Sequence, residues 1–221
     1  MSSLPASNYA REQMVSQQVR AWDVLDDTIL DLLRRLPREH FVPPAYRDTA
    51  YADLPLPLGH GQHMLSPSIV GRIIQAVAVK PGQTLLEVGT GSGFLSACFS
   101  LQGAIVSSIE IHADIAAQAR SNLSAAGIDR VALTHGDATE LLASAPRHDV
   151  VVVTASLPVY DPAYEAALSP GGRLFVVVGT GAAMDARLIQ LDARGERQEQ
   201  SLFETVLDPL INARPANPFH F

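Results

Sequence analysis

The chain has 221 residues with a net charge of −7, and 47% of them are hydrophobic, so it can bury the core of one α/β domain. Since only 18% of the residues are charged and no long run of lysine or arginine occurs, the composition excludes a disordered chain and argues against binding of nucleic acid. No apolar run of about 18 residues is present, so no membrane span is expected, and the single cysteine, Cys98, excludes an intrachain disulfide.

The first part of the chain predicts a small helical cap. Residues 1–8 are polar, lack the apolar stretch of a signal peptide and are expected to be disordered. Residues 9–19 and 28–36 carry apolar side chains at helical spacing, and Asp26 or Asp27 is suited to cap the second helix. Together with a single cysteine, which fits a reducing compartment, these features predict a cytoplasmic protein, either a monomer or a homodimer.

Residues 51–66 are the next informative stretch. They are too apolar to be disordered and too long for a simple connection, so we expect an ordered active-site loop without secondary structure. His60 and His63 in this loop are suited to bind a substrate or to act as a base, and simple packing explains them equally well. No metal site is predicted, because Asp53 alone does not complete a set of ligands. A helix is expected over 67–79.

A strand, a glycine-rich turn and a helix then form the strongest signal in the chain. Residues 84–88 are an apolar run typical of a buried strand, three glycines follow at every second position, and 94–101 is helix-like. Such glycines permit a tight turn, let a ligand approach the backbone and direct N–H groups towards it. The predicted cofactor-binding residues of this turn are Gly89, Thr90, Gly91 and Gly93.

Two carboxylates at strand ends indicate which cofactor is bound. Glu87, two residues before the first glycine, would repel a pyrophosphate but suits a positively charged ligand. Glu110 ends the strand expected over 104–109, where two ribose hydroxyls can donate to it, and Ile111 follows it. The third glycine comes one residue too early for a dinucleotide fingerprint. The pattern resembles class I methyltransferases and favours S-adenosyl-L-methionine over NAD.

The remaining chain alternates strands and helices. In the frame of a methyltransferase, Asp137 accepts from the adenine amino group and the N–H of Ala138 pairs with a ring nitrogen, whereas capping of local backbone is the alternative. Thr154 ends a strand where open sheets bind ligands, or else bonds to its own turn. Further strands are predicted over 131–134, 149–154, 173–178, 188–191 and 202–206, helices over 112–126 and 161–168, a turn over 169–172 and an irregular tail over 214–221.

Six motifs are together more specific than the glycines: Arg38-Glu39-His40-Phe41-Val42-Pro43, Tyr51-Ala52-Asp53, Pro55-Leu56-Pro57-Leu58-Gly59, Gly61-Gln62, Glu87-Val88-Gly89-Thr90-Gly91-Ser92-Gly93-Phe94 and Val153-Thr154-Ala155. They resemble the protein-L-isoaspartate (D-aspartate) O-methyltransferase family, over residues from about 12 to about 180. The resemblance implies an α/β, Rossmann-like class I methyltransferase fold with a mostly parallel seven-stranded sheet, helices on both faces and a helical N-terminal cap. It also implies S-adenosyl-L-methionine-dependent methylation of isoaspartyl residues in proteins or peptides, which is a repair reaction.

We therefore expect a single methyltransferase domain over residues 1–221. Within it, residues 9–66 form the cap and active-site loop, 67–212 the sheet region and 213–221 a tail. The partners expected are an isoaspartyl protein or peptide, or another methyl acceptor, with no nucleic acid and no membrane.

The chain departs from that family in its loop, which in the family reads Gly-x-Gly-Gln-Thr-Ile-Ser-x-Pro with the Ser implicated in catalysis. Here His63 and Leu65 stand at the Thr and Ser positions, and residues 203–209 also differ. A carboxylate acceptor is ionised at neutral pH and needs no general base, but Leu65 cannot orient it by a hydrogen bond. The adjacent Ser66 can replace that hydroxyl only if the loop shifts its register, since neighbouring side chains in an extended loop point opposite ways.

The acceptor is accordingly expected to bind around four candidate catalytic residues, His60, His63, Leu65 and Ser66. His63 is suited to bind the carboxylate as a cation, or to act as a base for a hydroxyl. Two alternatives stay open. One is a methyltransferase with a different acceptor, a small molecule or a hydroxyl, and the other is a catalytically silent protein that binds the cofactor.

Overall fold

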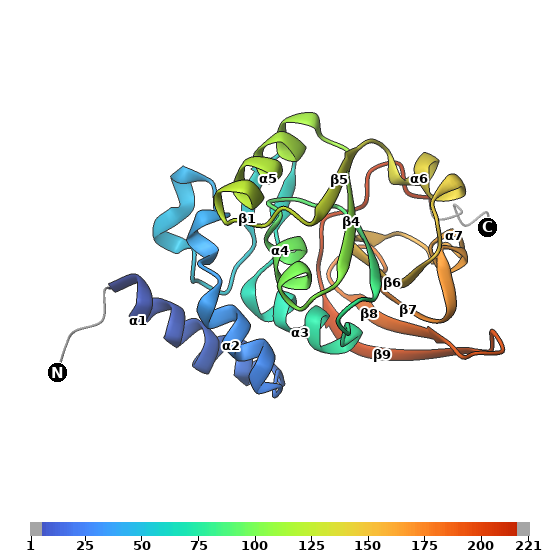
Figure 1. The fold of residues 1–221 in the computed structure, drawn as a ribbon, viewed down its shortest axis with the longest axis horizontal. Helices are drawn as coiled ribbons and strands as arrows, with labels where there is room; N and C mark the ends of the chain where they lie inside the picture. Colours follow the sequence, from blue (N-terminus) through green and yellow to red (C-terminus); the bar gives the residue numbers. More distant parts are fainter. Residues whose placement is uncertain (1–5, 216–221) are drawn as a thin grey trace.

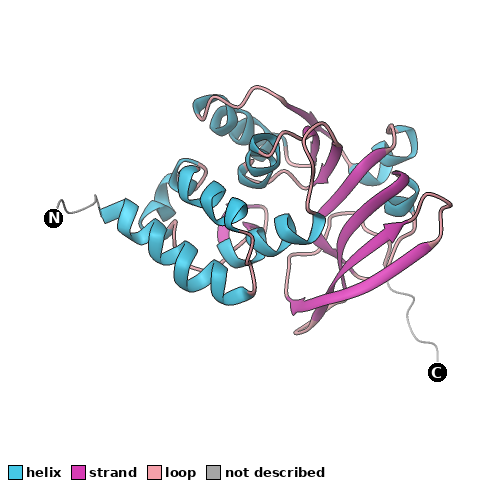
Figure 2. Cartoon of the chain, turned by 60° about the horizontal axis from the view of Figure 1, so that its bottom comes forward, coloured by secondary structure: helices cyan, strands magenta, loops and turns pink. Residues whose placement is uncertain are grey.

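The computed structural model describes residues 6–215, which form a twisted seven-stranded sheet with helices on both faces and a helical extension on one side (Figures 1 and 2). The predicted α/β class is confirmed. The strands are β1 (Leu56–Gly59), β2 (Gln62–Met64), β3 (Thr84–Val88), β4 (Ile105–Glu110), β5 (Val131–His135), β6 (His148–Leu157), β7 (Leu168–Val178), β8 (Met184–Leu191) and β9 (Arg197–Thr205). The α-helices are α1 (Ala6–Gln13), α2 (Asp27–Arg35), α3 (Pro67–Val77), α4 (Phe94–Leu101), α5 (Ala113–Ala125), α6 (Ala138–Leu141) and α7 (Ala163–Ala166).

The large sheet has the strand order β5-β4-β3-β6-β7-β8-β9. Strands β5, β4, β3, β6 and β7 are parallel to one another. β8 is antiparallel to both β7 and β9, so it is the one reversed strand of the seven. The central strands are covered on both faces, which explains why Val150, Val151, Val152 and Val153 all are fully buried. Because the carboxyl ends of parallel strands meet at one edge, the residues after β3, β4, β5 and β6 converge there.

Two hydrophobic clusters cover the two faces of the sheet. Apolar residues of α2, α3, α4 and α5 form the first cluster with alternate residues of the strands, such as Leu85 and Val106. The second cluster contains Leu86, Val88 and Tyr164, and includes residues of α6 and α7. The alternation along β3 shows how a short apolar run divides its side chains between two cores. No helix in residues 6–215 is long and apolar enough to cross a membrane.

The N-terminal cap differs in detail from the predicted helices. The expected disorder over 1–8 is wrong for 6–8, which begin α1, while 1–5 lie outside the described residues. The expected helix over 9–19 changes after Gln13 into a π-helical segment, Met14–Val19. This wider turn accompanies complete burial of Met14, Val15 and Val19 against the core.

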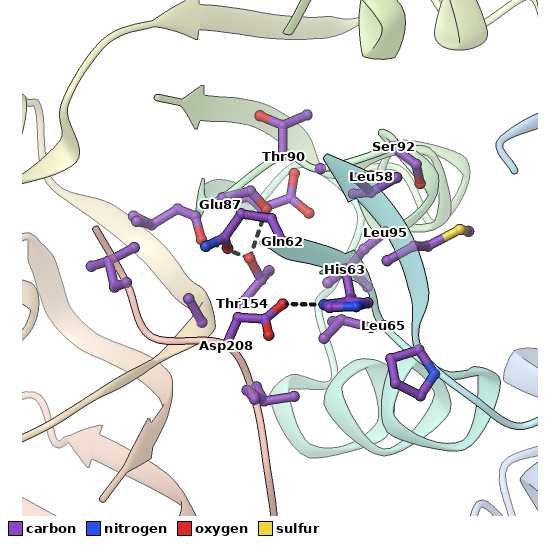
Figure 3. A pocket seen from close by; sticks show the side chains of 18 of the residues that line it. Leu58, Gln62, His63, Leu65, Glu87, Thr90, Ser92, Leu95, Thr154 and Asp208 are labelled. Carbon is purple, nitrogen blue, oxygen red and sulfur yellow. Dashed lines mark hydrogen bonds and ion pairs between the residues drawn. The ribbon is translucent and has the colours of Figure 1, made fainter. Parts of the chain in front are cut away.

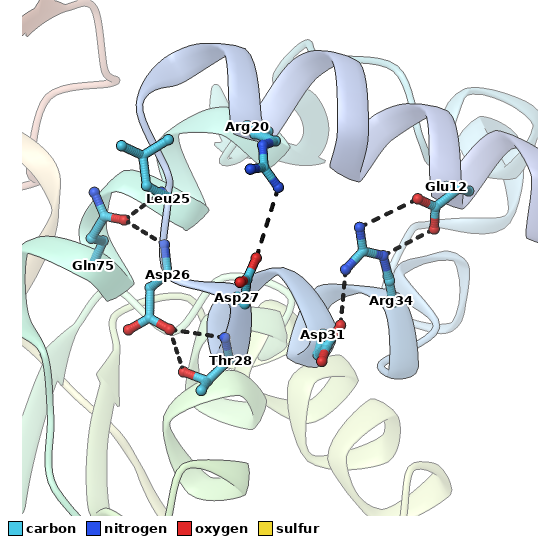
Figure 4. Close-up of polar contacts among 9 residues, drawn as sticks. All are labelled: Glu12, Arg20, Leu25, Asp26, Asp27, Thr28, Asp31, Arg34 and Gln75. Atoms are coloured by element: carbon cyan, nitrogen blue, oxygen red, sulfur yellow. Dashed lines mark hydrogen bonds and ion pairs between the residues drawn. The ribbon is translucent and has the colours of Figure 1, made fainter.

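Polar contacts hold the cap together (Figure 4). Of the two candidate caps, Asp26 is the one that caps α2, accepting from Thr28 N at 2.8 Å. Arg34 of α2 joins this helix to α1, since it lies 3.0 Å from Glu12. It also lies 2.8 Å from Asp31 of its own helix. Gln75 accepts from the backbone N–H of Leu25 at 2.8 Å, which ties the connection before α2 to α3. These contacts dock the cap on the sheet domain.

Residues 51–66 contain a β-hairpin that the sequence analysis did not predict. β1 and β2 pair antiparallel through a turn in which Gly59, His60 and Gly61 all have positive φ angles, of 107°, 54° and 74°. The strands are four and three residues long, which is too short for a readable alternation. The stretch is ordered, as expected, but the prediction that it lacks secondary structure is wrong.

Several strands are longer than predicted. β6 continues past Thr154 to Leu157, with an irregularity in its pairing with β7 between Val152 and Ser156. β7 begins at Leu168, so the predicted turn over 169–172 is part of an irregular strand. The short helix α6 was not predicted, and the tail is described only to residue 215, where it is irregular. Irregular pairing explains the differences in β6 and β7, because a shift in register interrupts the simple strand pattern.

Candidate active site

A cavity of about 690 Å³ lies at the carboxyl edge of the sheet (Figure 3). Its walls come from the ends of β3, β4 and β6, the hairpin β1–β2, the start of α3 and residues 205–211, which we call the C-terminal strap. The strap is fixed to β6 by backbone hydrogen bonds of 2.8 Å from Ser156 N to Asp208 O and from Leu210 N to Ser156 O. Twelve of the fourteen candidate residues line this cavity: His63, Leu65, Ser66, Glu87, Gly89, Thr90, Gly91, Glu110, Ile111, Asp137, Ala138 and Thr154.

The glycine turn is packed tightly against its neighbours. Gly89 has a φ of +91°, and a Cβ atom there would collide with the hydroxyl of Thr154. That hydroxyl lies 2.9 Å from Val88 O and 2.7 Å from Gly89 O, so Thr154 bonds to the neighbouring turn after β3 and not to its own. A Cβ at Gly91 would lie 3.2 Å from Leu58 Cδ1. Protein atoms therefore exclude a Cβ at Gly89 and leave little room for one at Gly91.

Gly93 does not line the cavity. It has a φ of +83°, and a Cβ there would lie 3.2 Å from Leu123 Cγ of α5. Gly93 lets α4 lie close to α5. The glycine motif alone does not show whether a glycine serves such helix packing or contacts the cofactor.

Glu87 is completely buried at the base of the cavity. Its Oε2 accepts from Ser96 and from Ser108, the latter at 2.7 Å, and Thr90 Oγ1 lies 2.6 Å from the Ser108 hydroxyl. Burial raises the pKa of Glu87 to about 7, although the two serine hydrogen bonds oppose this. Oε1 has no hydrogen-bond partner among the described residues. An orphaned buried carboxyl oxygen at a cavity wall suits a ligand that brings a positive charge or an N–H group.

Glu110 is held by two backbone N–H groups. Its Oε2 accepts from Gly91 N at 2.9 Å and its Oε1 from His112 N at 3.1 Å. Each carboxylate oxygen has a second lone pair, so both remain able to accept from the hydroxyls of a ligand. The fixed carboxylate thus fits a vicinal diol such as a ribose.

Asp137 caps α6, which was the alternative to adenine contact. Its Oδ1 accepts from Thr139 N at 2.8 Å, and its Oδ2 accepts from Asn212 at 2.6 Å. Partial burial raises the pKa of this carboxyl, but the hydrogen bonds from Asn212 and Thr139 outweigh it and lower the pKa overall. Asp137 and the buried Ala138 both line the cavity, so capping and ligand contact do not exclude each other.

The two histidines of the hairpin lie in different places. His63 Nδ1 lies 2.9 Å from Asp208 Oδ2 of the strap, and both side chains line the cavity (Figure 3). His60 is not among the lining residues; its Nε2 lies 2.9 Å from an Asp114 carboxylate oxygen and its ring stacks on His112 with centroids 4.1 Å apart. The structure therefore brings His63 to the other candidates and leaves His60 on the outside.

Leu65 and Ser66 both line the cavity, because the chain leaves strand geometry after Met64 before α3 begins at Pro67. The expected opposite orientation of these neighbours therefore does not keep Ser66 away. Its hydroxyl lies 3.2 Å from that of Ser68, a buried residue whose N–H donates to Asp53 Oδ1 at 3.0 Å.

Arg38 was not singled out as a site residue, although it stands in the first quoted motif. It is completely buried and lines the cavity, donating to Ala50 O at 2.9 Å and to Leu65 O at 2.7 Å. Burial lowers its pKa to about 10. Arg38 thus fixes the backbone at Ala50 and at Leu65.

One tryptophan of the N-terminal cap, Trp22, also lines the cavity. Its ring packs edge-on against Phe203 of β9, with ring centroids 6.5 Å apart. No group of three or more His, Cys, Asp or Glu side chains within residues 6–215 is arranged to hold a metal ion.

Comparisons with known proteins agree on one family. A family model described as protein-L-isoaspartate(D-aspartate) O-methyltransferase matches residues 9–214. The chain is 35% identical over 208 residues to the protein-L-isoaspartate O-methyltransferase of Koribacter versatilis, covering 94% of this chain and 93% of that protein. It is 38% identical over 198 residues to that of Methylorubrum extorquens, covering 90% and 86%.

A solved structure has the same fold. A protein-L-isoaspartate O-methyltransferase from Plasmodium falciparum, in complex with S-adenosyl-L-homocysteine, superimposes with a TM-score of 0.76 at 18% identity, covering 90% of this chain and 97% of that one.

Proposed function

The chain belongs to the protein-L-isoaspartate (D-aspartate) O-methyltransferase family, and on that premise we propose that it methylates the free carboxyl group of isoaspartyl residues in proteins or peptides. The observation that carries the proposal is one cavity that is lined by the strand-end carboxylates Glu87 and Glu110 and also by His63 of the hairpin and Leu65 directly after it. A cofactor site and an acceptor site that share one cavity are what a direct group transfer requires.

The cofactor proposed is S-adenosyl-L-methionine. Glu110 would hold the ribose, Asp137 and Ala138 the adenine, and the orphaned oxygen of Glu87 the positively charged methionine end. Thr154 keeps the turn in shape, because its hydroxyl bonds to the carbonyls of Val88 and Gly89. When bound, the cofactor supplies a methyl group on a sulfonium centre, ready for in-line displacement.

The protein's own part in the reaction is to align the acceptor and to exclude water. A carboxylate is ionised at neutral pH, with an ordinary pKa of about 4, and needs no base. The loss of one positioning hydrogen bond costs on the order of 2–4 kcal/mol in the barrier, and Leu65 offers none. Arg38 fixes the backbone at Leu65 by its hydrogen bond to the carbonyl, so the shape of this wall does not depend on the missing hydroxyl.

The test is transfer of labelled methyl from S-adenosyl-L-methionine to an isoaspartyl peptide, with the aspartyl peptide as control. We expect transfer selective for the isoaspartyl peptide. Leu65→Ser is expected to raise kcat by about 30-fold, because it restores a hydroxyl donor at the acceptor wall and such a contact lowers the barrier by on the order of 2 kcal/mol. The matched control is Leu54→Ser, which changes an exposed leucine outside the cavity lining.

Binding of the cofactor without transfer to the isoaspartyl peptide would contradict the proposal. Transfer to a small-molecule hydroxyl would then indicate a different acceptor, and no transfer to any carboxyl, hydroxyl or amine would indicate a silent cofactor-binding protein. We also propose a cytoplasmic location, which the single free and buried thiol of Cys98 supports because it fits a reducing compartment.

A further inference from the structure

The pair of His63 and Asp208 joins two separate walls of the cavity. His63 lies on β2 of the hairpin, Asp208 lies on the C-terminal strap, and they are 145 positions apart in the chain. Their side chains are 37% and 29% exposed, so both are reachable from the cavity mouth. Figure 3 shows a dashed line that joins the carboxylate of Asp208 to the ring of His63, with Leu65 next to them.

The contact with Asp208 determines what the other side of the ring can do. A carboxylate only accepts hydrogen bonds, so the Nδ1 of His63 carries the hydrogen that is donated to Asp208. In a neutral ring, Nε2 is then a lone-pair acceptor, whereas in a protonated ring it is an N–H donor. No hydrogen bond to Nε2 is formed within residues 6–215. The state of a single proton therefore sets whether this side binds a donor or an anion.

The rest of the cavity holds one permanently charged cation, Arg38, which is fully buried. Arg38 donates to two backbone carbonyls, and its Nη1 is buried without a hydrogen-bond partner among the described residues, so no solvent-accessible cation other than a protonated histidine faces an entering anion. The hydroxyls of Ser66 and Ser68 lie within hydrogen-bond distance of each other, and Leu65 has no polar atom. The titratable or charged groups that share the cavity with His63 are Arg38, Asp53, Glu87, Glu110, His112, Asp137 and Asp208. Carboxylates dominate this set, so an entering carboxylate meets a predominantly negative wall.

We propose that His63, supported by Asp208, takes up one proton when the isoaspartyl carboxylate binds and positions that carboxylate through its Nε2–H. This rests on the proposed function. The imidazolium supplies the counter-charge and the hydrogen bond that Leu65 does not. On transfer, a carboxylate oxygen forms the bond to the methyl carbon, the carbon–sulfur bond breaks and its electron pair stays on sulfur. The neutral ester no longer stabilises the imidazolium, so His63 releases its proton to solvent when the ester dissociates.

The experiment is calorimetric titration of an isoaspartyl peptide into the protein saturated with S-adenosyl-L-homocysteine, which prevents turnover. Titrations at pH 8, where a histidine is ordinarily neutral, are run in phosphate and in Tris, whose ionisation enthalpies differ widely. The difference in apparent enthalpy gives the number of protons taken up. We expect close to one proton per peptide for the wild type and none for His63→Gln, with an affinity at least about tenfold lower.

The chain offers a matched control in its second histidine–aspartate pair. His60→Asn removes a histidine that bonds an aspartate at the same 2.9 Å but lies outside the cavity lining, and asparagine tolerates its φ of +54°. It should keep both affinity and proton uptake. Proton release, no uptake by a wild type that binds and methylates the peptide, or unchanged uptake in His63→Gln would overturn the inference and leave the proposed function intact. Failure of the wild type to bind the peptide would overturn both.

Discussion

The two sides of the cavity are built differently. On the cofactor side, Glu87 and Glu110 are 0% and 5% exposed, and each is fixed by two hydrogen bonds from serines or backbone N–H groups. On the acceptor side, His63 and Asp208 are partly exposed and come from a short hairpin and an irregular strap. A substitution that breaks a buried hydrogen bond costs much stability, whereas a substitution in a partly exposed pair costs little. By this reasoning a substitution such as Leu65→Ser is tolerated on the acceptor side more easily than any change at the glycine turn.

Gly89→Ala, on the cofactor side, should have the largest effect of the substitutions considered, which is a loss of cofactor binding. The added Cβ would displace the Thr154 hydroxyl from the carbonyls of Val88 and Gly89, at a φ that L residues avoid. We expect binding of S-adenosyl-L-homocysteine to weaken by about 100-fold, equal to about 2.8 kcal/mol, by calorimetry. Gly195→Ala, with a φ of +83° and open space around it, controls for backbone strain. Equal binding losses in both variants would contradict the collision.

Glu87→Gln, on the cofactor side, should change how the free energy of unfolding depends on pH. Because the pKa of folded Glu87, about 7, lies above the ordinary value near 4.3, the ligand-free protein loses stability as the pH rises from about 4.5 through 7. The variant lacks this loss, so at pH 8 it should be more stable than the wild type by on the order of 2–3 kcal/mol, and much less so at pH 5. Urea unfolding at both pH values measures this. A gap independent of pH, or the same gap in the exposed Glu140→Gln, would refute it.

Ser156→Ala should have the smallest effect and act on the acceptor side alone. Its hydroxyl lies 3.1 Å from Leu207 O and 3.3 Å from Asp208 O, while two backbone bonds of the strap remain. The loss of one such bond is worth about 1 kcal/mol, so the KM for the acceptor should rise up to fivefold, with unchanged cofactor affinity. Ser144→Ala, which removes a hydroxyl bonded to Leu141 O outside the cavity, is the control. A fall in cofactor affinity would show that the two sides are not independent.

The same difference decides what the sequence predicts. β3 and α4 have the predicted bounds, because periodicity and glycine spacing are local signals. Glu87, Glu110 and Asp137 follow from their positions at strand ends, where sheet topology determines the neighbourhood. The two serines that donate hydrogen bonds to Glu87 lie on α4 and β4. No local sequence pattern shows which hydroxyls will reach a buried carboxylate.

The acceptor side depends on contacts between distant segments. Asp208 meets His63 across 145 positions, and Arg38 reaches the carbonyl of Leu65 across 27. The motif that contains Arg38 supports the family resemblance, but it does not show which atoms the guanidinium group bonds to. His60 and His63 look equivalent in the sequence, and only the hairpin turn places one outside the cavity and the other in it.

The position of Trp22 in the cavity lining has a practical consequence. Trp22 is the one tryptophan in the whole chain, and it lines the cavity with 42% of its surface exposed. Indole emission responds to the polarity of its surroundings, so every change in tryptophan fluorescence of this protein originates from Trp22. Filling of the cavity next to Trp22 can therefore be followed optically, in real time and without a label, on the native chain.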